Sequence, residues 1–105
     1  MKLLANKKQY AYDYVFDCPG CGFKHGFYTT GDVVWQFNGD LNNPTVTPSI
    51  LSTFPLRSGT KICHSFITNG MIQFLSDCTH KLAGQTLELP EIDMTYEKVD
   101  DENFV

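Results

Sequence analysis

The 105-residue sequence contains no long hydrophobic run. Its first residues, MKLLANKKQY, lack the continuous apolar core of about 7–15 residues that a secretory signal needs, and no segment approaches the ~20 apolar residues of a membrane span. These absences count against secretion and against a place in the membrane. We therefore expect a cytoplasmic protein whose four cysteines stay reduced and free to bind metal or do chemistry.

An excess of positive charge is also missing. Residues 1–90 contain seven basic and six acidic side chains, whereas residues 91–105 contain six acidic side chains and one lysine. Without a basic surface, direct binding to nucleic acid is not expected. No internal repeat or low-complexity segment divides the chain. We predict one zinc-stabilised domain over residues 1–90 and an acidic tail over residues 91–105, which is either solvated or in contact with a basic partner.

What the chain does contain is a series of short alternating segments separated by turns, which predicts an all-β, β-rich antiparallel fold. Prolines 44 and 48 place Leu41–Ser49 on the surface or along a sheet edge, because proline cannot donate to a strand ladder. Residues 77–83 read as one short helical turn, ended by Gly84. The segments predicted to form strands are Tyr10–Phe16, Phe23–Thr29, Val33–Phe37 and Gln85–Leu89, of which the first and last alternate.

The strongest local signal is the Asn-Gly dipeptide at 69–70, which favours a two-residue hairpin turn. In that hairpin the numbers of paired residues sum to 139. Because side chains alternate along a strand, Cys63 and, past the strand end, Cys78 share one face. His64 and Asp77 share the other face. The hairpin is therefore predicted to hold two thiols together, with a histidine and an aspartate behind them.

The four cysteines suggest a zinc site. Cys18 and Cys21 bracket Pro-Gly in the run CPGC, a zinc-ribbon-like knuckle that turns two thiolates toward one ion. Thiolates favour Zn²⁺ over harder cations. The simplest ligand set is Cys18, Cys21, Cys63 and Cys78, with His64, His80 and His25 as alternative ligands.

A catalytic role for the hairpin is a second possibility. His64, Asp77 and His80 together offer a carboxylate beside two histidines, the material of acid–base catalysis or of another metal site. The simpler interpretation is that Asp77 caps the helical turn while the histidines bond to thiolates or backbone. No sequence motif of a serine nucleophile, a phosphate loop or a dinucleotide site is evident.

The runs CPGCGFKH, FNGD, NPTVTPSI and CHSFITNGMIQFLSDCTHKLAGQTLELP resemble a family of small uncharacterised bacteriophage or prophage proteins. The resemblance extends from Cys18 to Pro90, and its most specific part is the last run. It implies a phage origin and zinc binding, and supplies no activity. The matching positions are Cys18, Cys21, Pro44, Pro48, Cys63, His64, Asp77, Cys78, His80 and Gly84.

These observations favour a non-enzymatic zinc module over an enzyme. The module would act in the host cytoplasm by contact with a host or phage protein, modulating a host factor or inhibiting host defence. The alternative is a small zinc-dependent hydrolase that uses His64, Asp77 and His80. Four protein ligands around the ion would favour the module, whereas three ligands and a water would favour the hydrolase.

Overall fold

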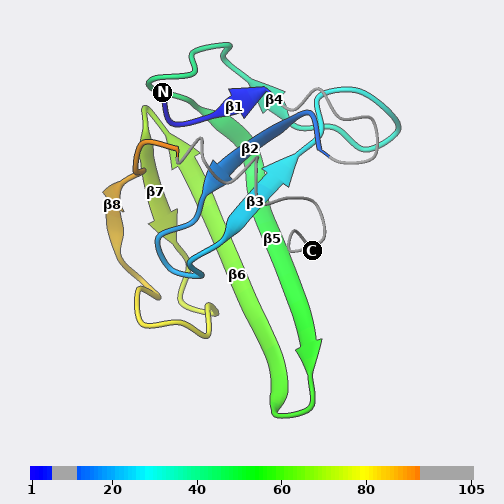
Figure 1. Ribbon diagram of the computed structural model, residues 1–105, viewed down its shortest axis with the longest axis vertical. Coiled ribbons are helices and arrows are strands. Elements are labelled where there is room, and N and C mark those ends of the chain that lie inside the picture. Colours follow the sequence, from blue (N-terminus) through cyan, green and yellow to red (C-terminus); the bar gives the residue numbers. More distant parts are fainter. Residues whose placement is uncertain (6–11, 93–105) are drawn as a thin grey trace.

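The computed structural model describes residues 1–5 and 12–92 and consists of two antiparallel sheets (Figure 1). The smaller sheet has the order β1-β2-β3 and comprises β1 (Leu4–Ala5), β2 (Tyr14–Asp17) and β3 (Lys24–Phe27). The larger has the order β4-β5-β6-β7-β8 and comprises β4 (Gln36–Phe37), β5 (Val46–Leu56), β6 (Gly59–Thr68), β7 (Met71–Phe74) and β8 (Thr86–Glu88). The predicted all-β antiparallel class is confirmed.

Two predicted features extend outside the described residues. The start of the first predicted strand, including Tyr10, is one of them, and the acidic tail beyond Ile92 is the other. Within the described ranges no helix is long and apolar enough to cross a membrane.

The predicted hairpin turn is present between β6 and β7. Thr68 pairs with Met71, as the sum of 139 requires, and the register continues to the pair Ser65–Phe74. Asn69 and Gly70 have φ angles of 50° and 79°, the left-handed conformation that a two-residue turn of this kind needs and that Asn-Gly adopts most easily.

The longest pairing joins β5 to β6, and these two strands project as an arm beyond the rest of the molecule (Figure 1). The expectation that Leu41–Ser49 avoids an internal strand is wrong for Val46 and Thr47, which lie in β5 between β4 and β6. Pro48 is tolerated because the register with β6 shifts between Val46 and Ile50.

The predicted helical turn at residues 77–83 is also wrong. This segment forms a succession of tight turns, with backbone hydrogen bonds from Cys78 to Leu75 and from Ala83 to His80. The chain cannot coil further there because Thr79 donates its backbone N–H to the carbonyl of Ile62, which ties the segment to β6. Gly84 does take the left-handed conformation, at φ 81°.

Both sheets contribute to one core. Burial of large apolar side chains of this kind stabilises a fold by about 1.5–3 kcal/mol each. Along β6 the buried residues Cys63, Ser65 and Ile67 alternate with the more exposed His64 and Phe66, so the predicted two faces of the hairpin are present. The largest fully buried side chains are Phe16, Phe27, Phe74, Leu3, Ile67, Ile72 and Leu89.

Candidate functional site

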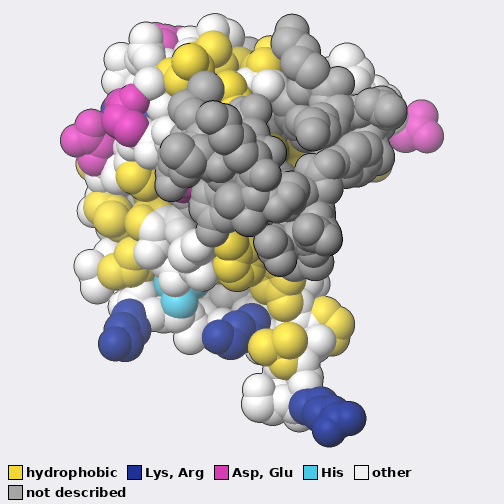
Figure 2. All heavy atoms as spheres, in the orientation of Figure 1, with side chains coloured by type: hydrophobic (Ala, Val, Ile, Leu, Met, Phe, Trp, Pro, Cys, Tyr) yellow, Lys and Arg dark blue, Asp and Glu magenta, His cyan; other side chains and the backbone are white. Residues whose placement is uncertain are grey.

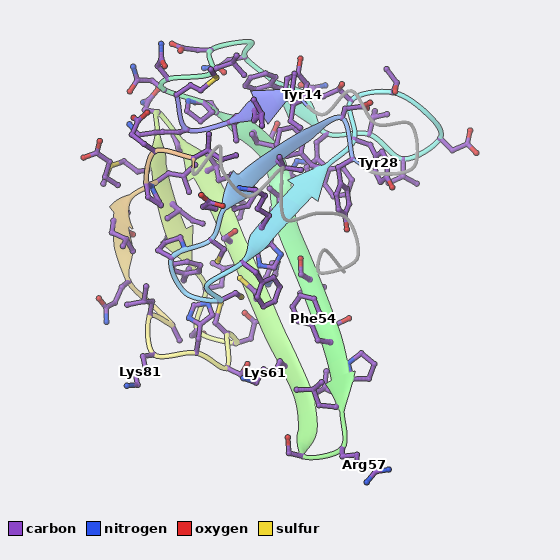
Figure 3. All side chains as sticks on the ribbon, in the orientation of Figure 1. Tyr14, Tyr28, Phe54, Arg57, Lys61 and Lys81 are labelled. Atoms are coloured by element: carbon purple, nitrogen blue, oxygen red, sulfur yellow. The ribbon has the colours of Figure 1, made fainter. Side chains whose placement is uncertain are left out.

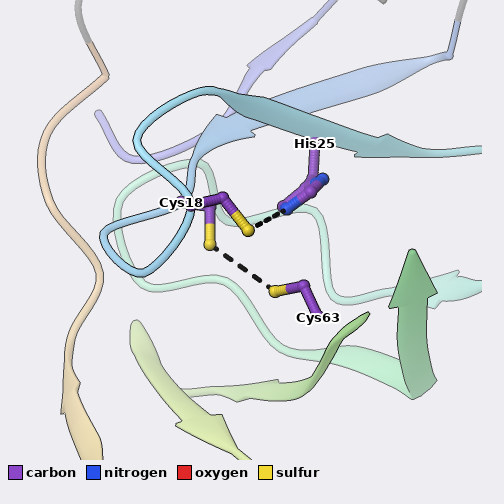
Figure 4. A group of neighbouring side chains, drawn as sticks. Cys18, His25 and Cys63 are labelled. Carbon is purple, nitrogen blue, oxygen red and sulfur yellow. Dashed lines mark hydrogen bonds between the residues drawn. The ribbon is translucent and has the colours of Figure 1, made fainter. Parts of the chain in front are cut away.

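A cluster of thiols lies where the CPGC turn meets β6 (Figure 4). Within the turn, Cys18 donates its backbone N–H to Phe23 and accepts one from Gly22, whose φ of 82° suits glycine. The turn between β2 and β3 therefore points Cys18 and Cys21 toward Cys63, which is buried on the inner face of β6.

The spacing within this cluster suits a tetrahedral metal ion. The sulfurs of Cys18 and Cys63 are 3.7 Å apart, and Nε2 of His25 is 3.3 Å from the sulfur of Cys21. Zinc bond lengths predict about 3.8 Å between two sulfurs and about 3.5 Å between sulfur and nitrogen at the corners of a tetrahedron. All four potential ligand atoms lie within 4.8 Å of one another. This group could hold a metal ion.

A second group shares Cys63 with the first and adds Cys78 and His80. The backbone N–H of Leu82 donates to Nδ1 of His80, so the proton of a neutral ring lies on Nε2, which is buried without a partner among the described residues. The Nε2–H of His80 is therefore suited to donate a hydrogen bond to a thiolate. The four cysteines singled out in the sequence thus fall into two groups that have Cys63 in common. In the first group the fourth potential ligand is His25.

The pKa values of the thiols show how closely they interact. Hydrogen bonds from Cys21 and Cys63 hold the pKa of the Cys18 thiol far below its usual range. The hydrogen bond to Cys18 raises the pKa of Cys21 to about 12 and also raises that of Cys63. The three thiols therefore interact strongly with one another. A bound cation would replace the thiol protons and allow all three sulfurs to ionise.

A chain of hydrogen bonds joins Ser49, His64 and Asp77 on the opposite face of the larger sheet. Oγ of Ser49 lies 2.9 Å from Nε2 of His64, and Nδ1 of His64 lies 3.0 Å from a carboxylate oxygen of Asp77. Because a carboxylate only accepts, Nδ1 carries the proton, and the lone pair of Nε2 is free to accept the hydroxyl proton of Ser49. These are the contacts of a serine nucleophile, its base and the group that orients the base.

Each member of this chain comes from a different element. Ser49 lies in the irregular part of β5, where three residues separate the pairs that Val46 and Ile50 make with β6. Bulges of this kind redirect side chains and are common next to active sites. Trp35 fixes the backbone by donating its indole N–H to the carbonyl of Ser49, at 3.1 Å.

The thiol cluster and the hydrogen-bonded chain are connected through the backbone. His64 follows Cys63, and Asp77 precedes Cys78, so each of these side chains is next to a cysteine that points to the other face. The backbone N–H of His64 donates to the sulfur of Cys78, and that thiol donates to the carbonyl of His64, both at 3.2 Å. Any movement of Cys63 or Cys78 would therefore move the histidine or the aspartate.

The sequence identified two of the three residues in the chain. His64 and Asp77, which the sequence places on one face of the hairpin, are hydrogen-bonded, so Asp77 bonds the histidine rather than capping a helix. His80, the third residue proposed with them, packs its ring against Phe74 with the centroids 4.5 Å apart. Ser49 was missed. Its only local signal was a serine directly after Pro48 in the run NPTVTPSI, the run that also carried the resemblance.

Comparison with known proteins gives a family match. The model of a family described as "Bacterial ubiquitination-like system serine protease (BubE)" matches residues 2–75. The matched segment contains Ser49 and His64 and ends just before Asp77. No curated protein and no solved structure matches the chain. The match supports a bacterial family and does not confirm the phage origin that the resemblance implied.

Proposed function

Because this chain belongs to the BubE family of bacterial ubiquitination-like system serine proteases, we propose that it is a serine protease with Ser49 as its nucleophile. The observation that carries the proposal is the unbroken series of hydrogen bonds from Ser49 through His64 to Asp77. The three residues come from β5, β6 and the turn after β7, so the fold and not closeness in the sequence brings them together.

The reaction follows from the protonation states. Oγ of Ser49 attacks the carbonyl carbon of the substrate while its proton passes to Nε2 of His64. Asp77 stabilises the resulting imidazolium through its bond to Nδ1. The proton then moves to the leaving amine as the C–N bond breaks, which leaves an ester on Ser49. A water molecule, deprotonated by His64, hydrolyses that ester and restores the serine hydroxyl.

The family description also suggests the substrate class. Since the family is named for bacterial ubiquitination-like systems, we propose that the substrate is a protein of such a system. A cytoplasmic location fits that role. The sequence resemblance suggested instead a phage protein that acts on a host factor or inhibits host defence, and the family match lends no support to that version.

We further propose that the thiol cluster holds a structural Zn²⁺, which would fasten the CPGC turn to β6. Cys18, Cys21 and Cys63 supply three soft ligands, and His25 or Cys78 supplies the fourth. We leave His64 out of this set because both of its ring nitrogens already have partners, Ser49 and Asp77. For the same reason a zinc-dependent hydrolase that uses His64 is not our proposal.

A fluorophosphonate probe, which reacts covalently with activated serines, tests the assignment of the nucleophile. We expect one adduct per chain, located on Ser49 by mass spectrometry, and no adduct on Ser49→Ala. Ser52→Ala is the matched control, because Ser52 lies on the same strand and bears the same hydroxyl, yet pairs with Cys63 away from the catalytic chain. Equal labelling of Ser49→Ala and wild type would refute the proposal.

A further inference from the structure

Among the described residues, no strand pairs with the edge of β5 beyond Ser49. β4 pairs only with Val46 and Thr47, although β5 continues to Leu56. Over the rest of its length, β5 has β6 on one side and no strand on the other among the residues that the structure describes. Figure 1 shows this side of β5 along the arm. An open edge presents unpaired backbone groups, which can pair with another extended chain.

The register shows which groups face outward. Leu56 pairs with Gly59 across the two-residue turn at 57–58, so hydrogen-bonded and non-hydrogen-bonded pairs alternate from that point. Thr53 and Leu51 fall in non-hydrogen-bonded pairs, and both direct their N–H and carbonyl away from β6. Pro55, which pairs with Thr60, is also in a non-hydrogen-bonded pair. Its missing N–H therefore does not weaken the ladder with β6.

The partners across the arm agree with this assignment. Ile62, opposite Thr53, donates its backbone N–H to the hydroxyl of Thr79 at 3.0 Å. The carbonyl of His64, opposite Leu51, accepts from Leu75 at 2.9 Å. In a non-hydrogen-bonded pair the two residues turn their backbone groups in opposite directions. Since these two partners point toward β7 and the turn that follows it, the groups on β5 point to the open edge.

This edge leads directly to the reactive hydroxyl. Ser49 lies two residues before Leu51 on the same strand, a distance of about 7 Å at the usual rise of a strand. A polypeptide that bonds to Leu51 and Thr53 would therefore carry its next residues past Oγ of Ser49. Leu51, whose side chain is 56% exposed beside His64, would contact alternate side chains of the added strand.

We propose that the protein binds its substrate as an extended polypeptide segment that adds to the edge of β5 at Leu51 and Thr53. This inference rests on the proposed protease function. A second copy of this chain fits the edge less well, because Arg57 and Lys61 both lie on the arm (Figures 2 and 3). Neither forms an ion pair within the described residues, and pairing two such arms would bring like charges together.

The test compares two proline substitutions on the two sides of the arm. Thr53→Pro removes an outward N–H from the open edge of β5 and places a ring where the substrate strand would lie. Thr60→Pro is the matched control, because Thr60 pairs with Pro55 and turns its N–H to the opposite side of the arm. The probe is a mixture of short peptides from a digested bacterial proteome, with cleavage products counted by mass spectrometry. Hydrolysis of a small aryl ester by wild type reports on the nucleophile alone.

We expect Thr53→Pro to cleave the peptides at least about tenfold more slowly than Thr60→Pro. Equal rates would overturn the inference, as would a wild type that hydrolyses the ester but cleaves no peptide. A wild type that hydrolyses neither would instead refute the proposed protease function. A wild-type dimer that Thr53→Pro converts to a monomer would show that a second copy occupies the edge, and would overturn the inference.

If Thr53→Pro fails to fold, Ser49→Ala provides an independent measurement. The probe is then the library peptide that wild type cleaves fastest. We expect that peptide to slow hydrogen exchange of the Leu51 and Thr53 amides, and unchanged exchange at both would overturn the inference.

Discussion

The bond between Asp77 and His64 gives the sharpest quantitative prediction for catalysis. Replacing Asp77 by asparagine keeps the shape and removes the charge that stabilises the imidazolium 3.0 Å away. At that distance Coulomb's law gives about 1.4 kcal/mol in water and about 5.5 kcal/mol at an effective dielectric constant of about 20. The side chains of His64 and Asp77 are 24% and 51% exposed, so an intermediate value of about 3 kcal/mol is appropriate.

That energy corresponds to a loss of about 150-fold in kcat. It is smaller than the roughly 10⁴-fold loss found where the aspartate of a serine protease is buried. The assay is steady-state hydrolysis of an aryl ester by Asp77→Asn, with Asp32→Asn as a control for the loss of one exposed carboxylate outside the hydrogen-bonded chain. KM should change little, because Asp77 is separated from the substrate by His64. A kcat within threefold of wild type would refute the role of Asp77.

Three further predictions concern the metal and the fold. Removal of zinc by a chelator should lower both the melting temperature and the ester hydrolysis rate, since His64 and Asp77 adjoin Cys63 and Cys78. If elemental analysis shows that the treated protein holds no zinc and its melting temperature and rate are unchanged, a structural ion is contradicted. Gly20→Ala should cost about 1–3 kcal/mol in a denaturant titration, because a Cβ at this position would lie 2.4 Å from the ring of His80. Hydrogen bonds from the residues at 29–30 lower the pKa of Asp13, so its stabilising effect is present above the unfolded pKa and disappears as the pH falls through the folded pKa. Asp13→Asn should therefore melt below wild type at pH 7, and the difference should shrink under acid conditions.

Local sequence determined the parts of the fold that depend on near neighbours. Asn69 and Gly70 can adopt positive φ angles cheaply, so the β6–β7 turn and its register were readable from two residues. That register in turn separated Cys63 from His64 onto opposite faces. The CPGC run marked the turn that could hold a metal ion in the same way, because its thiols and its flexible glycines lie within five residues.

Longer-range pairing overruled two of the local expectations. Pro48 argued against an internal strand, yet the register shift between Val46 and Ile50 removes the need for a hydrogen bond at that position. The segment after Cys78 carried helical caps, but its attachment to Ile62 through Thr79 holds it in successive turns. In the second case a hydrogen bond to β6 outweighed a capping preference of roughly 1 kcal/mol.

The sequence alone therefore determined an all-β chain with a candidate metal cluster and a histidine–aspartate pair. The place of the proposed nucleophile was decided only by tertiary structure. Ser49 is one serine among several on short polar segments, and the Pro48 before it does not mark it as a nucleophile. It meets His64 because β5 pairs with β6 through an irregular register, which turns its hydroxyl toward a histidine fifteen residues away. Contacts at that separation depend on how strands align, and no local propensity encodes that alignment.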